Sequence, residues 1–140
     1  MGKEKGKNAT VTPEACPCGL PLPYRECCGR FIDGDTPAPD AERLMRSRYT
    51  AYALGREAYL LATWHPDTRP PAGHLEGKLK PKWLGLRVLE HRQQDADHAT
   101  VVFVARYKLG GMALRMGETS RFVRLEGRWL YLDETVKETG

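Results

Sequence analysis

Apolar side chains recur at helical spacing after position 40. The stripe they form includes one charged residue, and its members are Leu44, Met45, Arg48, Tyr49, Tyr52 and Ala53. Residues three and four positions apart lie on the same face of a helix, so this spacing predicts a helix with one buried face. Asp40 is placed to cap its start, Glu42 favours its positive end, and Gly55 is placed to end it.

A second, shorter helix is predicted from about Glu57 to Trp64. Its side chains available for burial are Tyr59, Leu60, Leu61 and Trp64. Pro66 ends this helix, because the residue before a proline avoids the helical conformation. We expect the proline-rich segment 66–82 to be a loop with one helical turn around 74–79.

From Trp83 onward the pattern changes to the alternation that is typical of strands. Four strands are predicted, over residues 83–92, 98–109, 112–125 and 128–134. Gly110-Gly111 is a two-residue hairpin turn, and Glu126-Gly127 forms the next turn. Helices followed by an antiparallel meander are the pattern of an α+β domain whose helices cover one face of the sheet.

The N-terminal part of the chain lacks this periodicity. Residues 1–12 are rich in Lys, Gly and Asn, and we expect a disordered tail. Residues 13–34 are dense in Cys, Pro and Gly and cannot build a hydrophobic core by themselves, so a small metal-binding module is predicted there. Residues 34–39 form a linker, and the α+β domain is predicted to cover residues 39–136.

The four cysteines lie within this module as Cys16-Pro17-Cys18 and Cys27-Cys28. A tight turn between the first two lets both bind one ion, and the adjacent pair completes a tetrahedron. Thiols stay reduced in the cytoplasm, so clustered cysteines favour a metal site over disulfides. We expect one structural Zn²⁺ ion, because four sulfur ligands leave no open coordination position. Disulfides, free thiols and another metal such as iron are the alternatives.

Composition and charge exclude several functional classes. The 140 residues are 41% hydrophobic, with no apolar run of the roughly eighteen residues needed to span a bilayer. No N-terminal segment resembles a secretory signal, so we expect a cytoplasmic protein without a membrane partner. The formal net charge of +4 falls to about +2 when four thiolates bind one zinc ion. Nucleic-acid binding is therefore not expected.

The cysteine segment resembles the SEC-C motif, a small zinc module found at the end of the preprotein translocase motor and in many other bacterial proteins. The resemblance rests on Cys16-Pro17-Cys18-Gly19 and on Cys27-Cys28-Gly29. The motif usually continues with Ser-Gly, where this chain has Leu20 and Pro21, and this departure removes no metal ligand. The resemblance implies that the module binds zinc and contacts a protein partner.

Segments farther along are similar to the YchJ-like family of uncharacterised bacterial proteins. They are residues 44–52 (Leu-Met-Arg-Ser-Arg-Tyr-Thr-Ala-Tyr), 61–66 (Leu-Ala-Thr-Trp-His-Pro), 118–122 and 127–131. This similarity implies a cone like that of nuclear transport factor 2 (NTF2-like), in which a curved antiparallel sheet wraps the helices. It agrees with the order of elements predicted from periodicity and brings no established activity.

Five residues of the expected cone are candidates for a pocket: Arg48, Tyr49, Tyr52, Trp64 and His65. Arg48 interrupts an apolar stripe, so we expect it either to pair with a buried carboxylate, such as Glu118 or Asp133, or to hold a small anionic ligand. His65 either bonds to backbone at a helix end or lies at a pocket mouth as an acid or base. The three aromatic residues belong either to the core or to a pocket lining.

The remaining charged residues indicate no site. A loose basic stretch, expected to be solvated surface, consists of Lys78, Lys80, Lys82, Arg87 and Arg92. The other histidines, His74, His91 and His98, are isolated. The sequence contains no glycine-rich phosphate loop, no Gly-x-Ser-x-Gly nucleophile motif and no His-Glu-x-x-His metal motif.

Two functions of different classes are consistent with these patterns. In the first, the protein is a non-catalytic scaffold whose zinc module binds a protein partner. In the second, the cone encloses a pocket, and the protein is an enzyme or small-molecule binder that uses Arg48 and His65. The first is favoured because the sequence shows no acid–base pair or nucleophile. A deep pocket holding His65 beside a carboxylate would favour the second, and a filled cone would favour the first.

Overall fold

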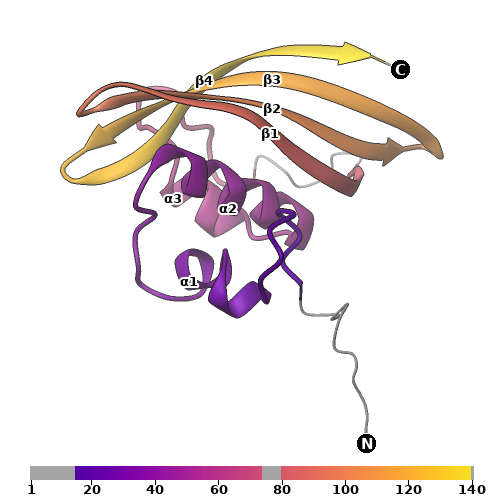
Figure 1. Ribbon diagram of the computed structural model, residues 1–140, viewed down its shortest axis with the longest axis horizontal. Coiled ribbons are helices and arrows are strands. Elements are labelled where there is room, and N and C mark those ends of the chain that lie inside the picture. Colours follow the sequence, from indigo (N-terminus) through magenta and orange to yellow (C-terminus); the bar gives the residue numbers. More distant parts are fainter. Residues whose placement is uncertain (1–14, 74–79, 140) are drawn as a thin grey trace, which may run out of the picture.

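Two layers make up the fold: a curved four-stranded antiparallel sheet and a group of helices on its concave face (Figure 1). The computed structural model describes residues 15–73 and 80–139, with side chains up to Thr135. The elements in order are η1 (Tyr24–Glu26), α1 (Gly29–Ile32), α2 (Ala41–Leu54), α3 (Glu57–Ala62), β1 (Lys82–Asp95), β2 (His98–Leu109), β3 (Met112–Leu125) and β4 (Arg128–Thr139). The predicted α+β class is confirmed. The expected tail (1–12) and the expected helical turn (74–79) lie outside the described residues.

Helix α2 begins and ends where the sequence predicts. The side chain of Asp40 accepts a hydrogen bond from the backbone N–H of Arg43 (2.7 Å), which satisfies one of the free N–H groups at the helix start. Gly55 adopts the left-handed conformation (φ 73°), and its N–H donates to the carbonyl of Tyr52, which ends the helix. Most of the apolar stripe is buried, and Arg48 is buried with it.

Helix α3 ends at Ala62, earlier than the predicted end at Trp64. The cause is pairing with β4, because the N–H of Tyr131 donates to the carbonyl of Thr63 and the N–H of His65 donates to the carbonyl of Tyr131, both at 2.8 Å. Trp64 thereby forms a parallel bridge with Tyr131. These hydrogen bonds need extended backbone, so the helix cannot continue through Trp64.

The sheet has the strand order β1-β2-β3-β4, as expected for a meander. Strands β2 and β3 have the predicted bounds, whereas β1 is longer at both ends and β4 continues to Thr139. The additional residues of β4 keep the ladder going, with Thr139 opposite Arg115. In β1 the register shifts between Trp83 and Gly85 and again farther along. Such irregularities bend a strand and increase its twist, which suits a curved sheet.

The main hydrophobic core lies between α2 and the inner face of the sheet. Its largest members are Leu44, Met45 and Tyr49 from α2 and Val101, Phe103, Phe122, Trp129 and Tyr131 from the strands. Alternate residues of β2 are buried, as the period of two predicts. Within the part of the chain that the structure describes, no helix is both long enough and apolar enough to cross a membrane.

Candidate functional site

The four cysteine side chains come together in the N-terminal module. Cys16 and Cys18 lie on a tight loop, in which the N–H of Gly19 donates to the carbonyl of Cys16 (3.2 Å). Gly19 has a φ of 97°, a conformation that favours glycine. Cys27 follows η1, and Cys28 directly precedes α1. The four Sγ atoms lie within 4.8 Å of one another.

These thiols are free and could hold a metal ion. The Sγ atoms of Cys18 and Cys27 are 3.7 Å apart, whereas disulfide-bonded sulfurs are about 2.05 Å apart. A tetrahedral ion with metal–sulfur bonds of about 2.3 Å places its ligands about 3.8 Å apart. The separation of Cys18 and Cys27 therefore matches that of two ligands on one metal ion, and soft sulfur donors select a thiophilic ion.

The cysteine cluster is buried against the α+β domain. Each cysteine has 5% or less of its surface exposed, and Leu86 of β1 packs against the cluster. The Sγ of Cys16 lies 3.8 Å from the Oγ1 of Thr50 on α2. Arg46 of α2 donates from Nη1 to the carbonyl oxygen of Cys18 (2.9 Å). The module is thus attached to α2 and β1 through both apolar and polar contacts.

Mutual hydrogen bonding and burial give Cys16, Cys27 and Cys28 different pKa values. Hydrogen bonds from Cys18 and Cys28 lower the pKa of Cys16. Burial raises the pKa of Cys27 to about 12, and hydrogen bonds to Cys16 and Cys18 raise the pKa of Cys28. Four thiolates within 4.8 Å of one another would repel each other unless a cation lay between them. Binding of a metal ion here would therefore release protons from the thiols.

A cavity of about 360 Å³ lies between α2 and the inner face of the sheet. Four of the predicted pocket residues line it, namely Arg48, Tyr49, Tyr52 and Trp64. The strands add the polar side chains of Glu118, Ser120 and Glu134. The cone is therefore neither filled nor purely apolar inside.

Sequence reasoning considered Glu118 only as a partner of Arg48 and overlooked Ser120 and Glu134. The alternation along β3 could have indicated that Ser120 lies in the cone with Glu118. Every second position shares one face, and these positions are Met116, Glu118, Ser120 and Phe122. Ser120 lies opposite Glu134 in the register of β3 and β4, which brings Glu134 to the same face.

Arg48 lies in the wall of this cavity, and one nitrogen of its guanidinium makes two hydrogen bonds. Nη1 donates to the carbonyl oxygen of Leu60 and to the Oγ1 of Thr63, each at 2.8 Å. The guanidinium carbon is 4.8 Å from the ring centre of Trp64 and 4.4 Å from that of Tyr131. These cation–π contacts stabilise a buried positive charge.

The ion pair predicted for Arg48 is wrong. Asp133 binds Arg121 on the outer face of the sheet, with 2.7 Å between Oδ1 and Nε, because the two residues lie opposite each other there. Glu118 attracts Arg48 only at longer range, and no carboxylate within residues 15–73 and 80–135 forms an ion pair with it. Burial lowers the pKa of Arg48 to about 10, so the side chain stays cationic at neutral pH.

Glu118 is a carboxyl group that titrates near neutrality inside the cone. Burial raises its pKa to about 7, and the charge of Glu134 adds to the effect. The hydroxyl of Ser120 donates to its Oε2 (2.5 Å), which acts in the opposite direction. Burial also raises the pKa values of Glu134 and Tyr52. Titratable groups with displaced pKa values in one cavity are typical of binding and active sites.

His65 lies outside this cavity, contrary to the pocket-mouth hypothesis. Its backbone N–H donates to the carbonyl of Tyr131 (2.8 Å), next to the bridge that Trp64 forms with the same residue. The side chain of Trp64 lines the cavity, and that of the following residue, His65, does not. The Nδ1 of His65 accepts a hydrogen bond from the N–H of Asp67 (3.1 Å). The ring therefore bonds to backbone, as an acceptor from the turn that follows it.

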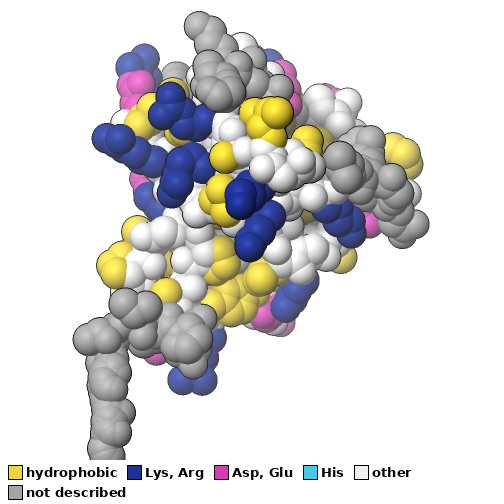
Figure 2. Space-filling model, turned by 90° about the vertical axis from the view of Figure 1, so that its right-hand side faces the viewer, with side chains coloured by type: hydrophobic (Ala, Val, Ile, Leu, Met, Phe, Trp, Pro, Cys, Tyr) yellow, Lys and Arg dark blue, Asp and Glu magenta, His cyan; other side chains and the backbone are white. Residues whose placement is uncertain are grey.

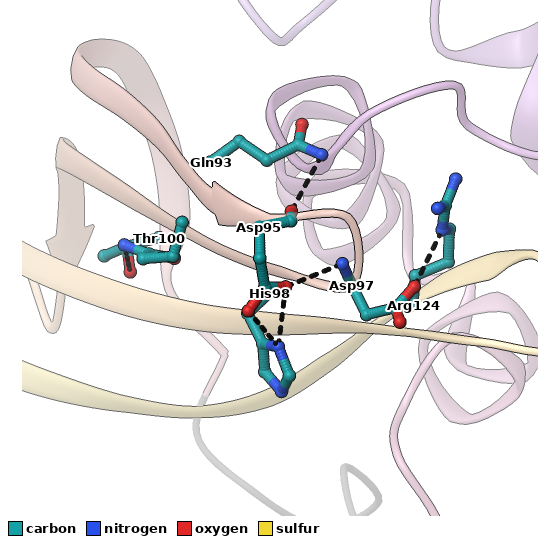
Figure 3. A network of polar contacts seen from close by, with 7 residues as sticks. Gln93, Asp95, Asp97, His98, Thr100 and Arg124 are labelled. Atoms are coloured by element: carbon teal, nitrogen blue, oxygen red, sulfur yellow. Dashed lines mark hydrogen bonds and ion pairs between the residues drawn. The ribbon is translucent and has the colours of Figure 1, made fainter.

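The turn between β1 and β2 contains a polar cluster on the surface (Figure 3). Asp95 accepts hydrogen bonds from the Nδ1 of His98 (2.9 Å) and from the N–H of Asp97 (2.8 Å). Arg124 of β3 reaches Asp97 through Nε (3.3 Å). All four side chains are exposed, so the cluster closes a turn and forms no enclosed site.

Lys and Arg side chains gather at the end of the sheet where β2 turns into β3 (Figure 2). Arg106 of β2 lies directly opposite Arg115 of β3, and Arg87 of β1 lines the same shallow groove. The predicted basic stretch belongs to this end only in part, because Arg92 forms an ion pair with Glu90 farther along β1. Lys78 lies outside the described residues.

Comparison with protein families matches residues 40–134 to the family described as YchJ, middle NTF2-like domain. A UPF0225 protein of Bordetella bronchiseptica is 51% identical over 138 residues, covering 94% of this chain and 99% of that protein. A UPF0225 protein of Ralstonia nicotianae is 54% identical over 136 residues, covering 89% of this chain and 93% of that protein.

Two solved structures share the fold. The solution structure of a SEC-C motif containing protein from Rhodopseudomonas palustris has a TM-score of 0.79 at 33% identity, covering 86% of this chain and 96% of that one. The crystal structure of a SEC-C motif containing protein from Psychrobacter arcticus has a TM-score of 0.76 at 29% identity, with 91% and 85% covered. The resemblances to the SEC-C motif and to the YchJ-like family, and the expected NTF2-like cone, are thereby confirmed.

Proposed function

The chain belongs to the YchJ family, and we propose that it is a cytoplasmic zinc-binding scaffold whose N-terminal module (residues 13–34) contacts a protein partner. The observation that carries this proposal is the group of four free cysteine Sγ atoms within 4.8 Å of one another. The description of two structural relatives as SEC-C motif containing proteins supports it.

Zinc is the ion that these donors favour. The separation of 3.7 Å between the Sγ atoms of Cys18 and Cys27 compares with about 3.8 Å in a zinc–thiolate tetrahedron. Four sulfur ligands leave no position for water or substrate, so the ion has a structural role. Reducing conditions in the cytoplasm keep the thiols available as ligands.

The ion contributes to the folding of the module. Its regular structure consists of two short elements, η1 and α1, and the cysteines pack mainly with Leu20, Tyr24 and Ile32. A metal site that does not exist in the unfolded chain adds its binding free energy to folding. Zinc would therefore hold the module in shape against α2.

The exposed side of the module supplies the contact with a partner. Leu22 is 42% exposed although it is apolar, and Arg25 and Glu26 nearby are exposed as well. We expect Leu22 to lie at the apolar centre of this contact and the two charged residues to lie at its polar rim. The carbonyl of Leu22 accepts a hydrogen bond from the N–H of Cys16 (2.8 Å), so loss of the metal would displace Leu22.

Two measurements test the proposal. Elemental analysis of protein purified without added metal should find one zinc ion per chain, and Cys27→Ser should lose it. Tagged wild-type protein, Cys27→Ser and Leu22→Ser are then used to capture partners from a lysate. We expect one partner to be captured by the wild type and lost with both variants, although Leu22→Ser keeps its zinc. A wild type without zinc, or equal capture by all three proteins, contradicts the proposal.

A further inference from the structure

The cavity under α2 contains one guanidinium and two carboxyl groups that the zinc proposal does not use. Its volume of about 360 Å³ falls within the range of about 300–1,000 Å³ that is usual for small-molecule sites. We propose that this cavity binds a small zwitterion of the amino-acid type, with the ligand carboxylate on Arg48, the ligand ammonium near Glu118 and Glu134, and an apolar side chain against the aromatic wall.

Arg48 supplies the carboxylate-binding end. Its Nη1 is occupied by the Leu60 carbonyl and the Thr63 hydroxyl, and the rings of Trp64 and Tyr131 keep the guanidinium in place. Its Nε and Nη2 have no hydrogen-bond partner among the residues that the structure describes. That edge of the guanidinium carries two parallel N–H groups, which is the geometry that binds both oxygens of a carboxylate.

Glu118 and Glu134 supply the ammonium-binding end. Ser120 donates to the Oε2 of Glu118 and lies opposite Glu134 across β3 and β4, so both carboxyl groups are on one stretch of the inner face. Glu118 is half-buried, and Glu134 is more exposed than Glu118. The Oε1 of Glu118 has no partner in the described part of the chain. A cation placed at two neighbouring carboxylates relieves their mutual repulsion.

Neither a simple anion nor a simple cation complements all three charges. An anion bound to Arg48 would be repelled by the two carboxylates on the facing sheet. A cation bound to those carboxylates would be repelled by Arg48. A molecule with both a carboxylate and an ammonium satisfies the two ends together. Burial raises the pKa of Glu118 to about 7, and a ligand ammonium would favour the ionised form of this side chain.

The walls of the cavity fit an apolar side chain. The rings of Tyr49 and Tyr52 lie against Trp83, with ring centres 5.5 Å and 6.2 Å from that of Trp83. Phe103 and Met116 line the cavity from the sheet. Burial of an apolar group against these residues is favourable, so we expect hydrophobic amino acids to bind in preference to polar ones.

The test uses full-length, zinc-containing protein. A thermal-shift screen of the standard L-amino acids at millimolar concentration selects the strongest ligand. Calorimetry then compares this amino acid with its deaminated acid and with its decarboxylated amine, at about pH 8 so that Glu118 is ionised. We expect a hydrophobic amino acid to bind. Each analogue should bind about tenfold more weakly, because each lacks one charged contact.

Glu118→Gln is the test variant, and Glu90→Gln on the outer face of β1 is its matched control. We expect Glu118→Gln to weaken binding of the amino acid about tenfold and not to weaken binding of the deaminated acid. Glu90→Gln should change neither. A screen in which no amino acid raises the melting temperature overturns the proposal, and so do two analogues that bind as tightly as the amino acid. Because zinc content is measured separately, neither of these two results bears on the proposal for the metal site.

Discussion

Arg46 of α2 donates a hydrogen bond from Nη1 to the backbone carbonyl of Cys18, at 2.9 Å, and so joins the cysteine cluster to the cone. The same guanidinium binds Glu42 through Nε (3.0 Å). Glu42 in turn lies 3.8 Å from the Nδ1 of His91 on β1. One arginine therefore connects the cysteine loop, the long helix and the first strand.

Arg46→Ala should lower the free energy of unfolding by about 1–3 kcal/mol, the usual contribution of a charged hydrogen bond. Arg43→Ala is the matched control on the same helix, because Arg43 is half exposed and its ion pair with Asp40 is long (3.6 Å). The control should lose less than about 1 kcal/mol. Urea unfolding of the zinc-containing proteins measures both. Equal losses would mean that the contact with Cys18 contributes nothing.

Cys27→Ser should abolish zinc binding and disorder the module while the cone stays folded. The buried residues of the main core all lie between Ala41 and Tyr131, whereas the proposed zinc ion would hold the module in shape. For the same reason, a chain that starts near Ala38 should fold. Amide NMR spectra of the variant should keep dispersed signals from the strands and lose those of residues 15–34. Global unfolding by a chelator at room temperature would show instead that both parts share one folding unit.

The stability of the protein should fall as the pH rises through neutrality, because of Glu118. Its pKa in the folded chain is about 7, above its ordinary value of 4.5, so between these values the folded chain keeps a proton that the unfolded chain has lost. This stabilisation is complete below about pH 4.5 and is lost as the pH rises through about 7. The ionisable groups that face Glu118 are Arg48 and Tyr52 from α2 and Glu134 from β4.

Glu118→Gln removes this dependence, because the amide does not titrate. Relative to the wild type, the variant should gain up to about 3 kcal/mol between pH 4.5 and pH 8, which is the value of the pKa difference. Unfolding by urea at a series of pH values measures the effect, with Glu90→Gln as the control that should follow the wild type. Parallel curves for all three proteins would rule out a displaced pKa at Glu118.

His65→Gln should leave amino-acid binding unchanged, because His65 does not line the cavity. It should lower the free energy of unfolding by about 1 kcal/mol, since the hydrogen bond from Asp67 is weakened or lost. Calorimetry and urea unfolding check the two expectations. A variant that keeps full stability and loses pH-dependent binding would show that His65 takes part in binding.

Much of the fold and the cysteine cluster could be predicted because their signals are local. Asp40 and Gly55 mark the ends of α2 through caps that involve only neighbouring backbone groups. The turn at Gly110-Gly111 sets the register of β2 and β3 in the same way. The cysteines lie in two close pairs on one short segment, so their clustering needs few long-range contacts.

The sequence by itself therefore determined the order of the elements, the bounds of α2, β2 and β3, and the four cysteines that come together in the N-terminal module. Only the tertiary structure decided where α3 ends, which groups bind Arg48, and that His65 does not line the cavity. Tyr131, a residue of β4 far along the chain, takes part in all three, because it pairs with Trp64, accepts a hydrogen bond from the N–H of His65 and lies against the guanidinium. Hydrophobic periodicity shows that a residue is buried, but the packing of distant segments decides which groups it meets there.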